Sequence, residues 1–255
     1  KTFNFISPPV KDKKNYIQYN WRQFFSLTIA AVIIFGSWLY PPTRYYWDQI
    51  DVFIFRSLND TLKVSATLQN FIAIFSRRSA DIIFDIIMLA ITFTYALWNK
   101  GQRKERLIKI LFMAIYILVI IQILNRLLIK IGLDLHYRQS PTMVLPDSLW
   151  LSKLLNDPMI RDHSSNSFPG DHALSFLLWA SMMWNLYGRR IGQIAWVFAI
   201  LFCLPRLFTG AHWFTDDFVG SGCLTLLANA IAFGLPVAQI FVYYLLKIFS
   251  SKSKY

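Results

Sequence analysis

Charged residues are scarce in this 255-residue chain, and acidic residues are scarcer than basic ones. Lys, Arg, Asp and Glu together make up 16% of it, whereas about a quarter of an average soluble domain is charged. Hydrophobic residues make up 55% and gather in long runs. The scarcity of charge argues against a soluble globular protein, and the apolar runs predict a polytopic membrane protein.

Cysteine is nearly absent too. Cys203 and Cys223 lie within apolar runs, and two cysteines supply neither a disulfide framework nor a metal site. We interpret both as small buried hydrophobic residues. No cluster of side chains has the spacing of metal ligands, so the sequence predicts no metal and no cofactor. The first twenty residues are polar and basic, so no cleavable signal peptide is predicted.

Six apolar runs approach or reach the length of a helical membrane span, which is about 17 to 25 residues. Between the first two runs, amphipathic spacing favours helices that lie at the membrane surface. The apolar stretch after Pro236 is either a kinked continuation of the last span or an interfacial helix. The predicted fold is all-α, one membrane-embedded domain over residues 1–255 with six transmembrane helices and interfacial helices in the first outer loop. The six predicted spans lie near residues 24–40, 82–98, 107–129, 173–187, 191–208 and 216–234.

Basic residues are concentrated in the segments that six spans would place on one side of the membrane. These segments hold 15 of the 26 Lys and Arg residues but two of the 14 Asp and Glu residues. The positive-inside rule therefore predicts that both termini are cytoplasmic, and that the loops after spans three and five face outward. The net charge of +12 does not indicate a nucleic-acid partner, because no basic cluster is combined with base-stacking aromatic residues. The basic segments are residues 1–22, 99–109, 188–190 and the tail after 246.

The outer loop before the sixth span holds the sharpest cluster, Arg206-Leu-Phe-Thr-Gly-Ala-His212-Trp-Phe-Thr-Asp216. On a helix, His212 and Asp216 would share one face, so the carboxylate could hold the Nδ1 hydrogen and leave the other nitrogen as a nucleophile. The guanidinium of Arg206 suits phosphate oxygens. An isolated pair of this kind is more often a helix cap, so the interpretation depends on the other clusters.

A second cluster, Ser167-Phe-Pro-Gly-Asp-His172, opens the fourth span. Backbone amides at a helix N-terminus attract anions, so Gly170 and Asp171 are candidate phosphate-binding positions and His172 is a candidate general acid and base. A third cluster consists of Lys130 and Arg138, two cations at the outer end of the third span. Such cations often contact only lipid headgroups.

The order Lys-Arg, Pro-Gly-Asp-His, then Arg-x5-His-x3-Asp resembles the type-2 phosphatidic acid phosphatase superfamily over roughly residues 120–220. The third motif matches in spacing, although Pro205 stands where the family usually has Ser. The second motif departs from the usual Pro-Ser-Gly-His. In the first motif seven residues separate Lys130 from Arg138, where six are usual, so Arg126 is an alternative to Lys130.

With these departures, the motifs resemble those of one branch of the superfamily. The members of that branch move a phosphoryl group from undecaprenyl diphosphate to the 1-phosphate of lipid A. The resemblance implies a phosphohistidine on His212, oriented by Asp216, with His172 as acid and base and with Arg206, Arg138 and Lys130 on the phosphate. It also implies a bacterial inner membrane and a periplasmic active site. The alternatives are a phosphatase that uses water as the acceptor and, more distantly, a non-catalytic lipid transporter or scaffold.

Overall fold

The computed structural model describes residues 17–98, 102–123, 125 and 138–251. These residues form helices joined by loops. The elements in chain order are α2 (Trp21–Leu39), α3 (Pro41–Val64), α4 (Ala66–Ser76), α5 (Arg78–Trp98), α6 (Arg103–Ile120), α7 (Pro141–Val144), α8 (Leu151–Leu154), α9 (Asp171–Tyr187), α10 (Arg189–Thr209), the π-helical turn η3 (Asp216–Ser221), α11 (Gly222–Asn229), the π-helical turn η4 (Ala230–Gly234) and α12 (Val237–Ser251).

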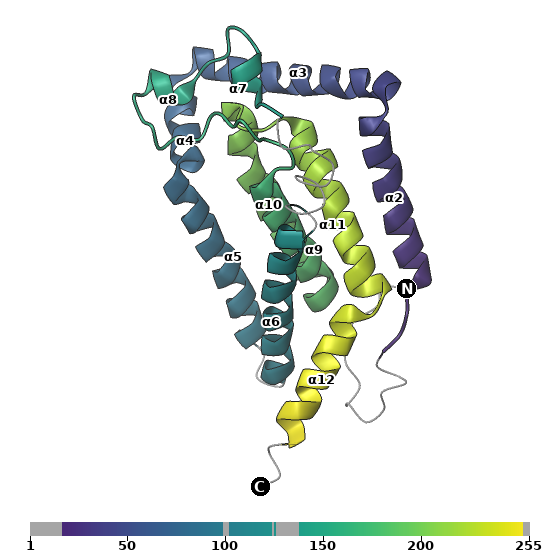
Figure 1. Ribbon diagram of the computed structural model, residues 1–255. Helices are drawn as coiled ribbons and strands as arrows, with labels where there is room; N and C mark the ends of the chain where they lie inside the picture. The colour runs from purple at the N-terminus through teal and green to yellow at the C-terminus, as the bar shows by residue number, and fades with distance from the viewer. Residues whose placement is uncertain (1–16, 99–101, 124, 126–137, 252–255) are drawn as a thin grey trace.

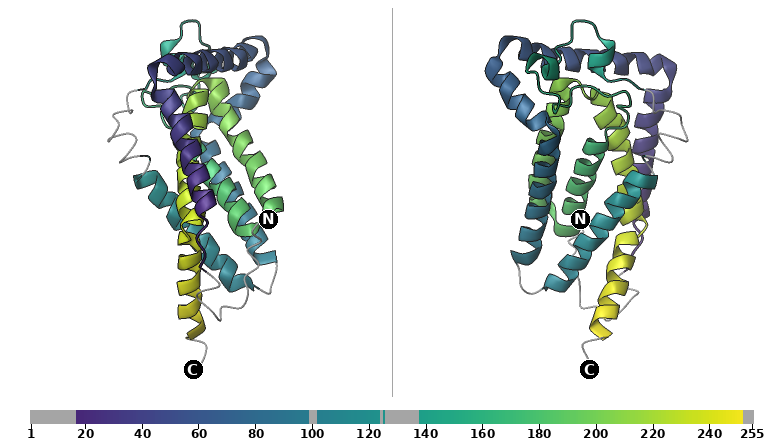
Figure 2. Two further views of the ribbon diagram at one scale, coloured as in Figure 1. Left: turned by 90° about the vertical axis from the view of Figure 1, so that its right-hand side faces the viewer. Right: turned by 60° about the vertical axis from the view of Figure 1, so that its left-hand side comes forward.

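The long helices form a bundle, and α3 lies across one end of it (Figure 1). The short helices α7 and α8 lie at the same end, as do the connections that lead into α9 and η3. The views in Figure 2 agree with this arrangement, with α12 extending from the opposite end. The all-α membrane fold that the sequence predicts is therefore confirmed, with α3 and α4 as the predicted helices of the first outer loop.

Five helices of the described residues are long and apolar enough to cross a membrane. They correspond to the predicted first, second, third, fifth and sixth spans. The fourth predicted span is α9, which has 17 residues and is shorter than those five. By length and composition alone, five of the six predicted spans are thus confirmed, and α9 is the sixth and shortest helix at a predicted span. The five are Trp21–Leu39, Arg78–Trp98, Arg103–Ile123, Arg189–Thr209 and Asp216–Gly234.

Helix α9 occupies the centre of the hydrophobic core. Its sequence is apolar on most sides, and residues such as Leu174, Leu178 and Met183 are fully buried against α5, α6, α10 and α11. The Trp179 indole donates to the hydroxyl of Thr92 in α5 at 2.9 Å, which satisfies a polar group in the core. A helix surrounded by protein need not match the thickness of the hydrocarbon layer by itself, which accounts for its shortness.

Helix α3 is amphipathic, and its buried face carries two polar residues. Asp51, Phe55, Asn59 and Leu62 are its buried residues, and their spacing of four, four and three places them on one face. The Asn59 amide donates to the carbonyl oxygens of Leu149 and Phe208 at 3.2 and 3.1 Å. This face of α3 therefore binds both the loop before α8 and the end of α10.

Helix α12 is the apolar stretch after Pro236, for which the sequence predicts either a kinked continuation of the last span or an interfacial helix. The chain breaks from helical geometry at Leu235, and α12 begins at Val237 as a separate helix. Phe241 of α12 packs against Phe112 of α6, with ring centroids 5.3 Å apart. The stretch is thus a kinked extension of the last span that packs on a neighbouring helix.

Candidate active site

His212 lies in the turn between α10 and η3 rather than on a helix. Helix α10 ends at Thr209, and Gly210 follows in the left-handed region with a φ of 76°. A Cβ at Gly210 would lie 2.5 Å from the ring of Phe55, so only glycine fits this close approach of the turn to α3. The prediction that His212 and Asp216 share a helix face is therefore wrong.

Asp216 nevertheless lies near His212, because its carboxylate caps the start of the next helix. Its Oδ2 accepts from the backbone N–H of Trp213 at 2.7 Å and lies 3.7 Å from the Nδ1 of His212. The same Nδ1 is 2.9 Å from the carbonyl oxygen of Ser167. A carbonyl oxygen can only accept, so Nδ1 carries a hydrogen, and the Nε2 of the neutral ring keeps its lone pair.

The protonation of His212 depends on two opposing effects. Burial disfavours the charged imidazolium, whereas the carboxylates of Asp216 and Asp217 attract it. The attraction prevails and raises the pKa of His212 above its ordinary value of 6.5. His212 must therefore lose a proton before its Nε2 can act as a nucleophile.

The second motif forms the N-terminus of α9, with Gly170 as N-cap and Asp171 and His172 as the first two residues. A Cβ at Gly170 would lie 2.2 Å from the Oδ1 of Asp217, so the missing side chain makes room for this carboxylate. Asp217 is buried, and its Oδ1 has no hydrogen-bond partner among the described residues. Asp171 accepts a hydrogen bond from the amide of Asn125.

Arg138 is held between two carboxylates. Its guanidinium forms an ion pair with Asp216, and another with Asp51 of α3 at 2.7 Å. The hydroxyl of Thr215 accepts from Arg138 at 2.9 Å and donates to Asp51 at 2.6 Å. Burial raises the pKa of Asp51, and the charge of Arg138 opposes this shift. Asp51 is 1% exposed and thus ties α3 to the turn that carries His212.

Arg206 is buried at the end of α10 and pairs with a different carboxylate. Its guanidinium donates to Asp81, in the first turn of α5, at 2.6 Å and to the carbonyl oxygen of Ser76 at 3.0 Å. The other carboxylate oxygen of Asp81 is 3.6 Å from the Nε2 of His172 and 3.8 Å from the Nε of Arg161. One carboxylate thus lies among three basic side chains.

A polar cavity of about 140 Å³ brings several of the predicted residues together. Its walls include both predicted histidines and Arg206, whereas Arg138 and Asp216 lie behind His212 in the ion-pair network and do not line it. The cavity can therefore hold a small anion against three histidines and two arginines. Its lining includes Arg161, His163, Asp171, His172, Arg206 and His212.

Two of the predicted phosphate-binding positions cannot be placed in the structure, and two carboxylates of the site were not predicted. Lys130 and its alternative Arg126 lie outside the described residues. Asp51 and Asp81 were not predicted as site residues. Their only sequence signals are an acid within an amphipathic segment and an acid at the start of a span, and neither belongs to a spacing motif. In the described part of the chain, no group of three His, Cys, Asp or Glu side chains is arranged to hold a metal ion.

Comparisons with known proteins agree with the residues that surround this cavity. The family model described as the PAP2 superfamily matches residues 136–241. The chain is similar to a curated protein of Escherichia coli (strain K12), lipid A 1-diphosphate synthase, with 29% identity over 236 residues. That alignment covers 92% of this chain and 97% of the relative. No solved structure matches the chain.

Proposed function

We propose that the chain is a membrane enzyme of the PAP2 superfamily and that it transfers a phosphoryl group between two lipids. In this proposal the donor is undecaprenyl diphosphate and the acceptor is the 1-phosphate of lipid A. The single observation that carries the proposal is the cavity in which His172, His212 and Arg206 meet. The acceptor is proposed from the name of the relative, which is similar over almost its whole length.

The first step of the proposed reaction is the attack of His212 on the terminal phosphorus of the donor. The carbonyl of Ser167 fixes the ring so that Nε2 is the attacking atom. A phosphorus–nitrogen bond forms, and the bond from that phosphorus to the bridging oxygen breaks. Undecaprenyl phosphate leaves with a proton from His172. The product on the enzyme is a phosphohistidine.

The second step returns the proton and transfers the phosphoryl group. A protonated phosphate oxygen of the acceptor attacks the phosphohistidine, His172 takes the proton of that oxygen, and the phosphorus–nitrogen bond breaks. Phosphoryl transfer depends mainly on positioning and on neutralising the oxygens, which is the role we propose for Arg206, Arg138 and Lys130. Gly170 and Asp171, at the start of α9, would contribute through the helix N-terminus.

The carboxylates that pair with the arginines have a positioning role in this proposal. Asp81 holds Arg206 in the cavity wall, and Asp51 together with Asp216 holds Arg138 behind His212. A phosphoryl group that enters the cavity would compete with Asp81 for Arg206, since a phosphate offers the same bidentate geometry with more charge. Arg138 would need to exchange a carboxylate before it could contact the substrate directly.

We also propose that the cavity faces the periplasm of a bacterial inner membrane, with both termini in the cytoplasm. The basic segments predict this orientation. It is consistent with the position of α3, α7 and α8 at the end of the bundle that is opposite to the end of α12 (Figure 1). Donor and acceptor would then reach the cavity from the outer half of the bilayer.

The proposal is tested by incubating the purified protein with undecaprenyl diphosphate, with and without lipid A, while free phosphate and the mass of lipid A are followed. An added phosphate on lipid A that is absent with His212→Ala supports the transferase. Free phosphate with unchanged lipid A would identify a phosphatase that uses water. Normal turnover by His212→Ala would contradict the phosphohistidine. No turnover by the unchanged protein would leave a non-catalytic lipid transporter or scaffold as the remaining candidate.

A further inference from the structure

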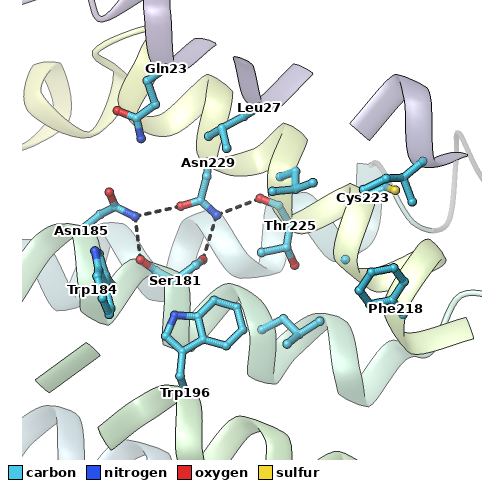
Figure 3. A pocket seen from close by; sticks show the side chains of 14 residues that line it. Gln23, Leu27, Ser181, Trp184, Asn185, Trp196, Phe218, Cys223, Thr225 and Asn229 are labelled. Carbon is cyan, nitrogen blue, oxygen red and sulfur yellow. Dashed lines mark hydrogen bonds between the residues drawn. The ribbon is translucent and has the colours of Figure 1, made fainter. Parts of the chain in front are cut away.

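A groove of about 490 Å³ lies between α2, α9, α10 and α11, within the part of the bundle that spans the membrane. Its walls are mainly apolar and include Leu27, Trp184, Trp196 and Phe218 (Figure 3). Along the sixth span it extends from Phe218 to Asn229, which is about 16 Å at 1.5 Å per residue. In a bilayer, such a groove is accessible mainly to hydrocarbon chains.

A small polar cluster on α9 and α11 lines one side of this groove. The Asn185 amide donates to the carbonyl of Ser181 and to the side chain of Asn229, which in turn donates to the Ser181 hydroxyl (Figure 3). These bonds join α9 to α11, as polar side chains commonly do between membrane helices. The hydroxyl of Thr225 is different. It lines the groove, its residue is 5% exposed, and it has no hydrogen-bond partner in the described part of the chain.

The groove lies near the candidate active site, because neighbouring cavities share wall residues. Cys223 lines both the groove and a second apolar cavity of about 90 Å³. That second cavity is also lined by Pro169, which in turn lines the polar cavity beside His172 and His212. The three cavities are therefore neighbours along the bundle, with Cys223 between the groove and the second cavity and Pro169 between the second cavity and the polar cavity.

We infer that this groove binds the hydrocarbon tail of the lipid diphosphate donor, an inference that rests on the proposed function. The diphosphate would lie in the polar cavity, and the tail would pass Pro169 and Cys223 and follow α11 toward Asn229. The groove is built on the helix that begins with Asp216, so a tail in it places the diphosphate beside His212. The acceptor has a separate approach along the loop that carries Arg161 and His163, on the exposed rim of the polar cavity.

The test fills the groove without touching the polar cavity. Leu27→Trp adds bulk from α2, and Gly222→Leu adds it from α11, where a Cβ would meet nothing closer than the carbonyl oxygen of Asp217 at 3.7 Å. Phosphoryl transfer to lipid A is measured with undecaprenyl diphosphate and with geranyl diphosphate, which has a short tail, as the donor. We expect the KM for the long donor to rise about tenfold, the loss expected when two or three methylene groups remain unburied, with kcat nearly unchanged. The short donor should keep its kcat/KM in both variants.

Ile29→Trp is the matched control, because Ile29 is on the same helix α2, is 55% exposed and does not line the groove. An unchanged KM for the long donor in both groove variants would overturn the inference. So would equal losses with the two donors, an equal effect of Ile29→Trp, or a rise in KM for lipid A alone, which would assign the groove to the acceptor. Failure of the proposed function itself is recognised separately, as phosphoryl transfer from geranyl diphosphate that persists in His212→Ala.

Discussion

The two halves of the chain contribute different parts of the candidate site. The histidines and arginines that we propose to act on the phosphoryl group lie between residues 138 and 212, within or next to the segment that the PAP2 family model matches. Asp51 and Asp81, which pair with the two arginines, lie on α3 and α5 in the first half of the chain. The second half thus supplies the reactive groups, and the first half supplies counter-charges that hold them. The sequence motifs contain the reactive groups of the second half, but they give no information on the carboxylates of the first half.

His212→Ala should have the largest effect, because it removes the proposed nucleophile from the second half. We expect phosphoryl transfer to fall at least about 10⁴-fold, as in other enzymes that lose a nucleophile. Transfer to lipid A is measured by mass, and the thermal unfolding of the variant serves as the control for folding. A loss of less than tenfold in a folded variant would assign the chemistry to another group.

Asp81→Asn tests whether the first half is needed for the reaction. The change removes the charge that holds Arg206, and a displacement of about 1 Å at such a group commonly costs about 10²-fold in rate. We expect this loss mainly in kcat, with partial recovery in Asp81→Glu. Asp85→Asn is the matched control, because Asp85 is one turn further along α5 and exposed. Equal losses in the two Asn variants would show that α5 has only a structural role.

Asp51→Asn should have a smaller effect on rate and a clear effect on stability. Asp51 binds Thr215 and Arg138, and removal of one partner from a buried ion pair costs about 3 kcal/mol of folding free energy. Because Arg138 keeps its pair with Asp216, we expect kcat/KM to fall only about tenfold. Thermal unfolding of Asp51→Asn is compared with that of Asp48→Asn, an exposed acid on the same helix. Equal unfolding temperatures would contradict the role of Asp51.

The smallest expected effect is a shift in the pH midpoint of kcat/KM. This shift tests the contribution of the Asp216 carboxylate, in the second half of the chain, to the pKa of His212. The raised pKa of His212 means that the ring stays protonated to a higher pH than usual, so kcat/KM should rise with pH through a midpoint above 6.5. Asp216→Asn removes one of the carboxylates that raise this pKa, and the midpoint should move to lower pH. The profile is measured with a short-tailed donor so that binding to the membrane stays constant. A midpoint that Asp216→Asn leaves in place would contradict this assignment.

Much of the fold could be predicted from the sequence, because apolar runs are set by the thickness of the bilayer. Five predicted spans begin and end close to their observed limits, and the helices of the first outer loop follow from amphipathic spacing. The sequence also predicted that the fourth span, residues 173–187, is short, but it did not indicate the protein neighbours that surround α9. Spacing motifs also predicted the residues that meet in the polar cavity, because His172, Arg206 and His212 lie at helix ends that share one side of the bundle.

The remainder of the site depends on contacts that have no local signal. The carbonyl of Ser167 lies against His212 only because the loop before α9 packs beside the turn after α10, and the sequence predicted Asp216 in that position. Asp81 reaches Arg206 across 125 positions of sequence, and Asp51 reaches Arg138 across 87. Pairings of this kind follow from the packing of whole helices, so neither composition nor spacing indicates them.

The distance in sequence between these partners has a consequence for how the protein is made. Synthesis proceeds from the N-terminus, so α3 and α5 are made before the arginines that pair with them exist. Until then, Asp51 and Asp81 lie near the aqueous end of an incomplete bundle, where their charges remain hydrated. The last long helices to be inserted therefore both complete the bundle and neutralise its earlier half. A nascent chain released before Arg206 would carry Asp81 without its partner and without a finished site.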